Sequence, residues 1–354
     1  MHSWLTEDRR LRSLNWEEGT SRLTALEDAI ADRLCARHAI AVTSPMVAFH
    51  LAYRAAGQAL GTAVLTTSLA DPAVVRAAVA TGHRLRFADV DERGHLAVDG
   101  VAAQVGLDGA PTMVVASHYA GHPCDVARLA AASGGAVVIE DAIDALGAVG
   151  ADGRPVGAPA YASMTVVGIH PVRASAPAQG AVILTDDVML ASRCRQLRDD
   201  RAEHRLSELH AALALVELGR LGTSIEQRAR VAAGYDAALA SQPLTTPVLP
   251  ASGTHSSWAA YPVRVPAWVR ADLQEYLRTL GIGGRRLAML LHRHPYYGRY
   301  ADALPAELPV TERFAAETLV LPTSSAFGDG EVERITDALA SLGADDRSRV
   351  ALAG

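Results

Sequence analysis

Hydrophobic and polar positions along the first half of the chain predict alternating helices and strands. In residues 21–38 apolar side chains recur at the spacing of one helix face. Short apolar runs follow, separated by segments of helical pattern, and these runs predict buried strands. The predicted strands are 39–43, 63–65, 84–88, 112–116, 136–139 and 164–169, and the helices between them include 47–56, 72–81 and 124–133. This order is typical of an α/β protein with a mostly parallel sheet and helices on both faces.

The second half of the chain has a different pattern. Residues 205–239 predict a long helical region, which we expect to break near Gly219 and Gly222. A stretch rich in Pro and Thr at 243–250 is typical of a linker. After it come a predicted strand at 261–265 and predicted helices at 270–280 and 329–342. We therefore expect two domains: a large one over residues 1–240, including an N-terminal helical segment, and a small α+β domain over residues 241–354.

Composition and charge exclude several classes of partner. Hydrophobic residues make up 49% of the chain, and the formal net charge is -6 with no basic patch, so neither nucleic acid nor a membrane surface is expected as a partner. No apolar run approaches the roughly 20 residues of a membrane span, and the first residues have no signal-peptide pattern. Cys35, Cys124 and Cys194 are few and far apart, which favours reduced, mostly buried thiols in a cytoplasmic protein.

The chain contains no lysine. All 33 basic residues are arginine. An Ala-rich and Arg-rich composition is expected of a genome with high GC content, and this bias is one explanation. Whatever the cause, no lysine side chain is present to act as a nucleophile toward a carbonyl group.

Several collinear segments resemble one known family. Residues 118–125 read H-Y-A-G-H-P-C-D, 138–148 read V-I-E-D-A-I-D-A-L-G-A, and 169–173 read I-H-P-V-R. Residues 205–212, 308–312 and 319–322 read R-L-S-E-L-H-A-A, L-P-V-T-E and L-V-L-P. Together they resemble the DegT/DnrJ/EryC1/StrS aminotransferases of deoxysugar and antibiotic biosynthesis. The resemblance implies the fold type I architecture, with a mostly parallel seven-stranded sheet flanked by helices and a smaller C-terminal α+β domain, and it implies a dimer.

The same resemblance implies that the pyridoxal-phosphate (PLP) contacts of the family are replaced. Arg173 stands at the position of the cofactor lysine, and a guanidinium group is not a useful nucleophile toward an aldehyde. The family's phosphate-binding S-G-T turn reads Ser44, Pro45, Met46 here, and Pro45 has no N–H group. Gly168 stands where the family has a second phosphate-binding serine. The family's G-Y-N loop is deleted near residues 199–204.

Two aspartates mark the ring position of the lost cofactor. Asp71 stands where the family has an aromatic residue that stacks on the pyridine ring, and a carboxylate cannot stack. Asp141 aligns with the aspartate that pairs with the pyridine nitrogen. Because Asp141 alone does not hold PLP, we expect no cofactor and no transamination.

The resemblance places a set of polar side chains around the old cofactor cavity, and these are the candidate catalytic residues. They are Asp71, Asp141, Asp144, His118, His170 and Arg173. Clustered carboxylates can form an acid/base pair, but a solvent-filled, abandoned pocket tolerates them too. Arg173 can form a salt bridge with Asp141 or bind a substrate carboxylate or phosphate. His118 and His170 fit the family's ordinary pattern, which favours structural roles.

A further histidine pair follows in the C-terminal part. His292 and His294 are two residues apart, but no third ligand stands at a supporting spacing, so we expect a surface or dimer-edge role and no metal site.

Three functions remain open. The first is a PLP-independent lyase, isomerase or cyclase that acts on a polar small molecule, anionic ones included, in specialised-metabolite or deoxysugar biosynthesis. The second is a non-catalytic subunit that binds an active paralogue or pathway enzyme through the family's dimer face, and the third is a binding protein for a nucleotide sugar. In each case we expect a homodimer or a heterodimer with a paralogue.

Overall fold

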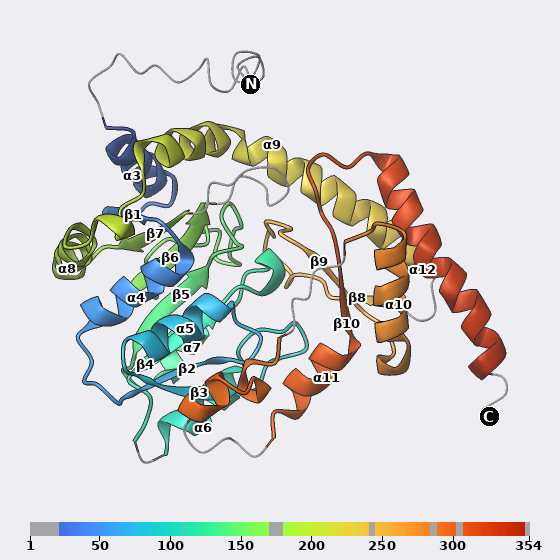
Figure 1. The fold of residues 1–354 in the computed structure, drawn as a ribbon, viewed down its shortest axis with the longest axis horizontal. Helices are drawn as coiled ribbons and strands as arrows, with labels where there is room; N and C mark the ends of the chain where they lie inside the picture. Colours follow the sequence, from blue (N-terminus) through green and yellow to red (C-terminus); the bar gives the residue numbers. More distant parts are fainter. Residues whose placement is uncertain are drawn as a thin grey trace.

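The chain folds around two β-sheets that are joined by one long helix (Figure 1). The computed structural model describes residues 21–107, 109–169, 180–240, 245–283, 289–301 and 307–350. Its strands are β1 His38–Val42, β2 Ala63–Thr67, β3 Arg84–Ala88, β4 Met113–Ser117, β5 Val137–Ala142, β6 Met164–Ile169, β7 Gly180–Thr185, β8 Thr246–Pro247, β9 Tyr261–Arg264 and β10 Thr318–Leu321. Its α-helices are α3 Arg22–Arg33, α4 Pro45–Ala56, α5 Pro72–Ala80, α6 Val98–Val105, α7 Val126–Ala132, α8 Val188–Asp199, α9 Glu208–Leu239, α10 Ala267–Thr279, α11 Pro309–Glu317 and α12 Asp329–Val350.

The larger sheet has seven strands in the order β1-β7-β6-β5-β4-β2-β3. Strands β6, β5, β4, β2 and β3 run parallel to their neighbours within this group, whereas β7 is antiparallel to both β6 and β1. Its strands are almost entirely buried, as the continuous apolar runs of the sequence predict for a sheet covered on both faces. The expectation of a mostly parallel, seven-stranded sheet is confirmed.

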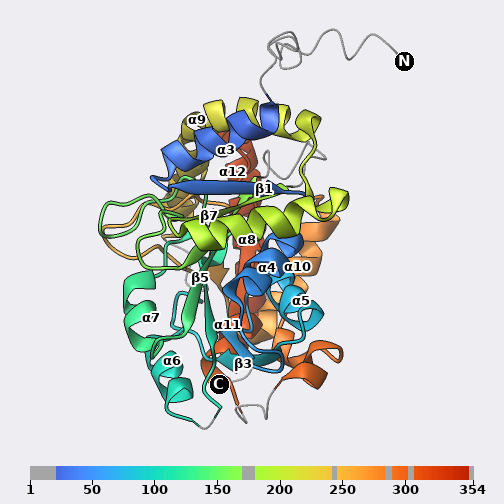
Figure 2. The ribbon, with the colours of Figure 1, turned by 90° about the vertical axis from the view of Figure 1, so that its left-hand side faces the viewer.

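Helices cover both faces of this sheet (Figure 2). Helices α4, α5 and α8 pack on one face, where Phe49, Val74 and Ala191 join strand residues in one apolar cluster. On the other face α3 and the start of α9 cover the β1-β7-β6 side, and α6 and α7 cover the β4-β2-β3 side. The carboxyl ends of β2, β4 and β5 therefore lie between two helical layers.

Helix α9 connects the two sheets. Its N-terminal part buries Ala211 and Ala214 against α3, and its C-terminal part buries Tyr235 and Leu239 against the smaller sheet. The predicted break near Gly219 and Gly222 is wrong, because Glu208–Leu239 is one continuous helix of 32 residues. A glycine in a helix costs about 1 kcal/mol relative to alanine, which packing at both ends of α9 can offset.

The smaller sheet is antiparallel, in the order β10-β9-β8, and packs against α10, α12 and the end of α9. Strand β8 lies within the predicted linker 243–250, so the linker prediction is wrong at Thr246 and Pro247, which pair with β9. Residues 243 and 244 of that stretch lie outside the described residues. Helix α12 begins at Asp329 as expected and extends past the predicted end at residue 342.

The three cysteines are less uniformly buried than expected. Cys35 is exposed, Cys124 is half-buried, and Cys194 is buried between α8 and its neighbours. Cys35 follows the end of α3 with a left-handed φ of 54°. Among the described helices, none combines the length and apolar character that a membrane span requires.

Candidate functional site

A cavity of about 210 Å³ lies at the carboxyl ends of β2, β4 and β5. These strands are adjacent in the sheet, so the residues that follow them meet at one edge. Its polar wall is formed by Asp71, Ser117, His118, Tyr119, Asp141 and Asp144. In open α/β sheets ligands bind outside the carboxyl ends of parallel strands, which makes this cavity the candidate active site.

Asp141 is the buried carboxyl group of the cavity. It lies near the end of β5 and is 5% exposed. Burial above all, together with the negative charges of Asp71 and Asp144, raises the pKa of Asp141 to about 7, although the nearby Ser117 hydroxyl and the Ile143 amide lower it. The Ile143 amide donates to Asp141 Oδ1 at 3.2 Å. A carboxyl group with this pKa can both accept and donate a proton near neutral pH.

Asp71 lines the cavity and also has a structural role. It caps the N-terminus of α5, where its Oδ1 accepts the Ala73 amide at 2.8 Å and Pro72 begins the helix. A carboxylate is stabilised at a helix N-terminus by the helix dipole. Asp71 therefore supplies a fixed negative charge beside Asp141.

Asp144 connects the cavity to a second one of about 370 Å³. The second cavity lies between α9, the end of β6 and the residues around β10, and Asp144 lines both cavities. Ser257 fixes the backbone here, because its hydroxyl donates to the Asp144 carbonyl oxygen at 2.6 Å. From α9, Arg228 faces the same space, and burial lowers the pKa of Arg228 while the charge of Asp144 raises it. A ligand can thus extend from the carboxylates into the space between the two sheets.

His118 lines the cavity, but both of its ring nitrogens are engaged elsewhere. Its Nδ1 accepts the Cys124 amide at 2.9 Å, so the neutral ring carries its hydrogen on Nε2 and donates it to Glu140 at 2.7 Å. These bonds hold the turn between β4 and α7 together. This geometry favours the structural interpretation of His118 over proton transfer at Asp141.

Two of the predicted catalytic residues lie outside the described residues. These are His170 and Arg173, so an ion pair between Arg173 and the aspartates stays a prediction.

Ser117 and Tyr119 were missed by the sequence analysis. Ser117 is 6% exposed and Tyr119 is 5% exposed; among the described residues the Tyr119 hydroxyl has no hydrogen-bond partner, whereas the Ser117 hydroxyl lies close enough to Asp141 to lower its pKa. Buried polar atoms are rarely left without a partner. Burial raises the pKa of Tyr119, so its hydroxyl keeps its proton and remains a donor. The signal in the sequence was the position of both residues beside the end of a predicted strand.

His292 differs from expectation as well. It is 8% exposed, its Nδ1 lies 2.6 Å from Ser68 Oγ, and its Nε2 lies 3.2 Å from Glu312 Oε1. The surface role is therefore wrong for His292, because the segment packs beneath the turn after β2, and the dimer-edge role stays a prediction. In the part of the chain that the structure describes, no three His, Cys, Asp or Glu side chains are arranged to hold a metal ion.

Comparison with known proteins decides the family. The model of the DegT/DnrJ/EryC1/StrS aminotransferase family matches residues 8–340. The chain belongs to this family. Among solved members, DesV of S. venezuelae, solved in complex with a ketimine intermediate, is 27% identical over 92% of this chain and 90% of its own, with a TM-score of 0.83.

Two other similar structures cover nearly the whole chain. DesI, solved in the presence of its TDP-sugar product, is 29% identical over 94% of this chain and 87% of its own, with a TM-score of 0.83. Helicobacter pylori PseC, an aminotransferase of pseudoaminic acid biosynthesis, is 20% identical over 94% of both chains, with a TM-score of 0.85. The fold type I architecture expected from the sequence is confirmed by this likeness.

The residues at the family's cofactor positions fit PLP poorly. The chain has no lysine amine to hold it. At the start of α4, Pro45 offers no N–H, and the Ser44 hydroxyl already accepts the Val47 amide at 3.2 Å. Asp71 presents a charged carboxylate, engaged in capping α5, where an aromatic ring is expected to stack. The residues at these positions therefore do not form a PLP site.

Proposed function

We propose that this member of the DegT/DnrJ/EryC1/StrS family works without PLP. It would perform acid–base chemistry (dehydration, isomerisation or cyclisation) on a polar small molecule of deoxysugar or specialised-metabolite biosynthesis. The observation that carries the proposal is Asp141, a buried carboxyl with a pKa of about 7 in a cavity at the carboxyl edge of the sheet. General acid–base catalysis is most efficient when the pKa lies near the working pH.

The cavity supports a division of roles among its side chains. Asp141 would remove a proton from a carbon next to a carbonyl group and return it to a neighbouring position. Asp71 and Asp144 would keep the pKa of Asp141 high through their negative charge. The hydroxyl groups of Ser117 and Tyr119, which stay protonated, would donate hydrogen bonds to ligand oxygens.

The size of the two connected cavities supports a substrate larger than the reacting group. The first, of about 210 Å³, has room for about seven water molecules, which suits one sugar ring. The second, of about 370 Å³, would take the rest of the ligand. DesI was solved in the presence of its TDP-sugar product. We therefore propose a nucleotide-linked keto sugar as the first substrate class to test.

Solvent proton exchange tests this proposal without knowledge of the product. A nucleotide-linked keto sugar is incubated with the protein in deuterium oxide and followed by proton NMR. We expect loss of the signal from the hydrogen beside the carbonyl, and we expect Asp141→Asn to abolish this loss. The matched control is Asp125→Asn, at an exposed helix cap outside the cavity.

Two outcomes of this test contradict acid–base catalysis at Asp141. One is exchange that is equally fast in the wild type and in Asp141→Asn. The other is tight binding of the sugar without exchange, which favours the binding-protein alternative. Absence of both binding and exchange, together with a stable complex with a lysine-bearing paralogue, favours the partner-subunit alternative.

A further inference from the structure

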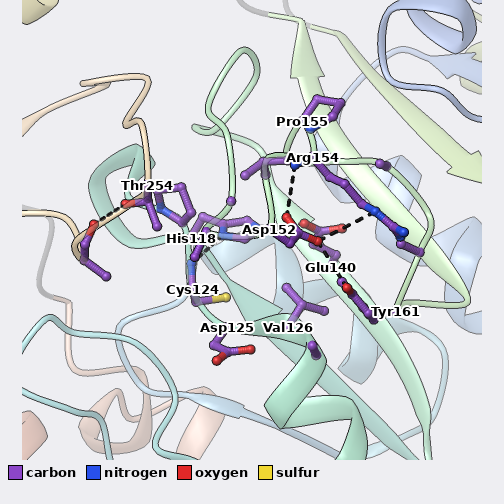
Figure 3. Close-up of a pocket in the computed structure, with 18 residues that line it drawn as sticks. His118, Cys124, Asp125, Val126, Glu140, Asp152, Arg154, Pro155, Tyr161 and Thr254 are labelled. Carbon is purple, nitrogen blue, oxygen red and sulfur yellow. Dashed lines mark hydrogen bonds and ion pairs between the residues drawn. The ribbon is translucent and has the colours of Figure 1, made fainter.

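A third cavity, of about 400 Å³, lies beside the turn between β4 and α7 (Figure 3). Its polar wall includes His118, Cys124, Glu140, Asp152, Arg154 and Tyr161. In Figure 3 Cys124 lies next to the His118 ring, and Asp152, Arg154 and Tyr161 gather on the other side of the view. The acid–base site uses Asp141, whereas this cavity is lined by its neighbour Glu140. A thiol, an imidazole and a carboxylate thus share one wall.

Glu140 is a buried carboxylate with a full set of donors. It is 5% exposed, and Thr165 Oγ1 donates to its Oε2 at 2.8 Å. His118 Nε2 donates to Oε1 at 2.7 Å, and the Gly157 amide approaches the same oxygen at 3.3 Å. Hydrogen bonds to a carboxylate stabilise its charged form. Glu140 therefore fixes the orientation of His118 and would stabilise a positive charge on the ring.

His118 presents its basic nitrogen to Cys124. Because Nε2 carries the hydrogen that Glu140 accepts, the lone pair of Nδ1 points toward Cys124, whose amide donates to it at 2.9 Å. Burial lowers the pKa of His118, but the negative charge of a Cys124 thiolate and the contact with Glu140 outweigh burial and raise the pKa well above its ordinary value, which favours transfer of the thiol proton to the ring. A thiol, a base and a group that orients the base are the parts of an activated nucleophile.

We propose that Cys124 is a nucleophilic thiol, that His118 is its base and that Glu140 positions His118. The ligand would be a small molecule with an electrophilic acyl carbon, such as a thioester. Much of the remaining wall is apolar, including Pro123, Val126 and Ala158, which favours an uncharged acyl group.

The proposed step is an acyl transfer to sulfur. The thiol proton moves to His118 Nδ1, which gives up its bond to the Cys124 amide, and the sulfur forms a bond to the acyl carbon. The bond between that carbon and the leaving thiolate breaks. The leaving thiolate then takes the proton from Nδ1, so protons and electrons balance and the product is an acylated Cys124.

The chain contains its own control thiols for a test. Cys35 is exposed and Cys194 is buried, so exposure alone predicts that Cys35 reacts faster than Cys124. The probe is iodoacetamide under native conditions, with each cysteine quantified by peptide mass spectrometry over a range of pH. We expect Cys124 to react about ten times faster than Cys35 near neutral pH, with a midpoint below the ordinary thiol value of about 8.5. Incubation with an acetyl thioester of N-acetylcysteamine should add one acetyl group, at Cys124.

The Glu140→Gln variant separates positioning from simple exposure. We expect it to move the pH midpoint of Cys124 upward and leave that of Cys35 unchanged, provided that circular dichroism shows a folded protein. If the variant does not fold, the wild-type pH profile alone decides. A Cys124 rate equal to or below that of Cys35, with an ordinary midpoint, overturns the proposal. Since this test involves neither a sugar nor Asp141, its failure leaves the acid–base proposal standing, and the reverse also holds.

Discussion

Asp71, Asp141 and Asp144 carry the same functional group in three different surroundings. Asp71 caps the N-terminus of α5, and Asp144 borders the space between the two sheets. Asp141 is almost fully buried. Burial and, after it, the two nearby charges raise the pKa of Asp141 to about 7. These surroundings favour the protonated form of Asp141. The folded protein therefore loses stability when Asp141 gives up its proton.

The raised pKa of Asp141 predicts how the stability of the protein depends on pH. The folded pKa lies above the unfolded value, so the native state binds more protons between these two values, and its stability falls as pH rises through this window. Asp141→Asn removes this loss and should raise the free energy of unfolding at about pH 8 by about 2 to 4 kcal/mol. At about pH 4 the effect should vanish. Urea unfolding at both pH values checks this.

A loss of stability in Asp141→Asn at the higher pH would contradict this prediction. That result would show that Asp141 is held as an ion pair, as the sequence analysis considered for Arg173. The matched control is Asp187→Asn, at the exposed N-cap of α8, where Asn caps about as well as Asp, so little change in stability is expected at either pH.

At the level of elements, helix α9 determines how the two sheets are connected. Gly219 and Gly222 lie in its middle, exposed, and an added methyl group would meet nothing within 4 Å at either position. Gly147 is different: it has a φ of +88° and lies against α9, where a methyl group would come within 2.2 Å of Ile225. Substitution by alanine should therefore stabilise the protein at the two helical glycines and destabilise it at Gly147.

Substitution of the α9 glycines by alanine should stabilise the protein. Gly219→Ala and Gly222→Ala should each raise the free energy of unfolding by about 0.5 to 1 kcal/mol, because alanine has the better helix propensity. Gly147→Ala is the control and should destabilise. Thermal unfolding checks all three. A clear loss of stability or of assembly in Gly219→Ala would mean that this stretch of α9 is covered in the assembled protein.

The sequence predicted the regular elements better than their connections. Apolar runs identified β1, β2, β4, β5 and β6, because strands buried on both faces need apolar side chains nearly throughout, whereas β3, at the edge of the sheet, was identified from an alternating run. Strand β7 was not predicted, although its sequence is equally apolar, because residues 170–179 before it show no clear hydrophobic pattern. The polarity of the cavity was predicted from Asp71, Asp141 and Asp144. The orientation of His118 and the exposure of Ser117 and Tyr119 to the cavity depend on side-chain contacts that no periodicity encodes.

At the level of the whole molecule, the likeness to known family members extends over both sheets. The apolar residues Val188 and Met189 on α8 and Leu209 at the start of α9 are exposed in the single chain. Exposed apolar side chains on a protein of this family are consistent with an assembly larger than one chain.

We predict a dimer. Light scattering after size exclusion should give twice the mass of the 37.2 kDa chain, or the mass of a complex with a paralogue when both are produced together. The interface should exceed about 2,000 Å² in total, as in obligate assemblies. Charge introduced by Met189→Glu should shift the equilibrium toward the monomer, whereas Leu60→Glu, an exposed leucine in the loop after α4, should not. A monomer at micromolar concentration would contradict the prediction.

The central claim is that this aminotransferase fold works without PLP, and an absorption measurement tests it most directly. The purified protein is incubated with excess PLP, freed of unbound cofactor, and its near-ultraviolet and visible spectrum is recorded before and after addition of an amine donor. Because the chain has no lysine and Pro45 removes an N–H from the expected phosphate turn, we expect no retained cofactor band and no change on adding the donor. A retained band that shifts with the donor, with micromolar affinity for PLP, would contradict the account.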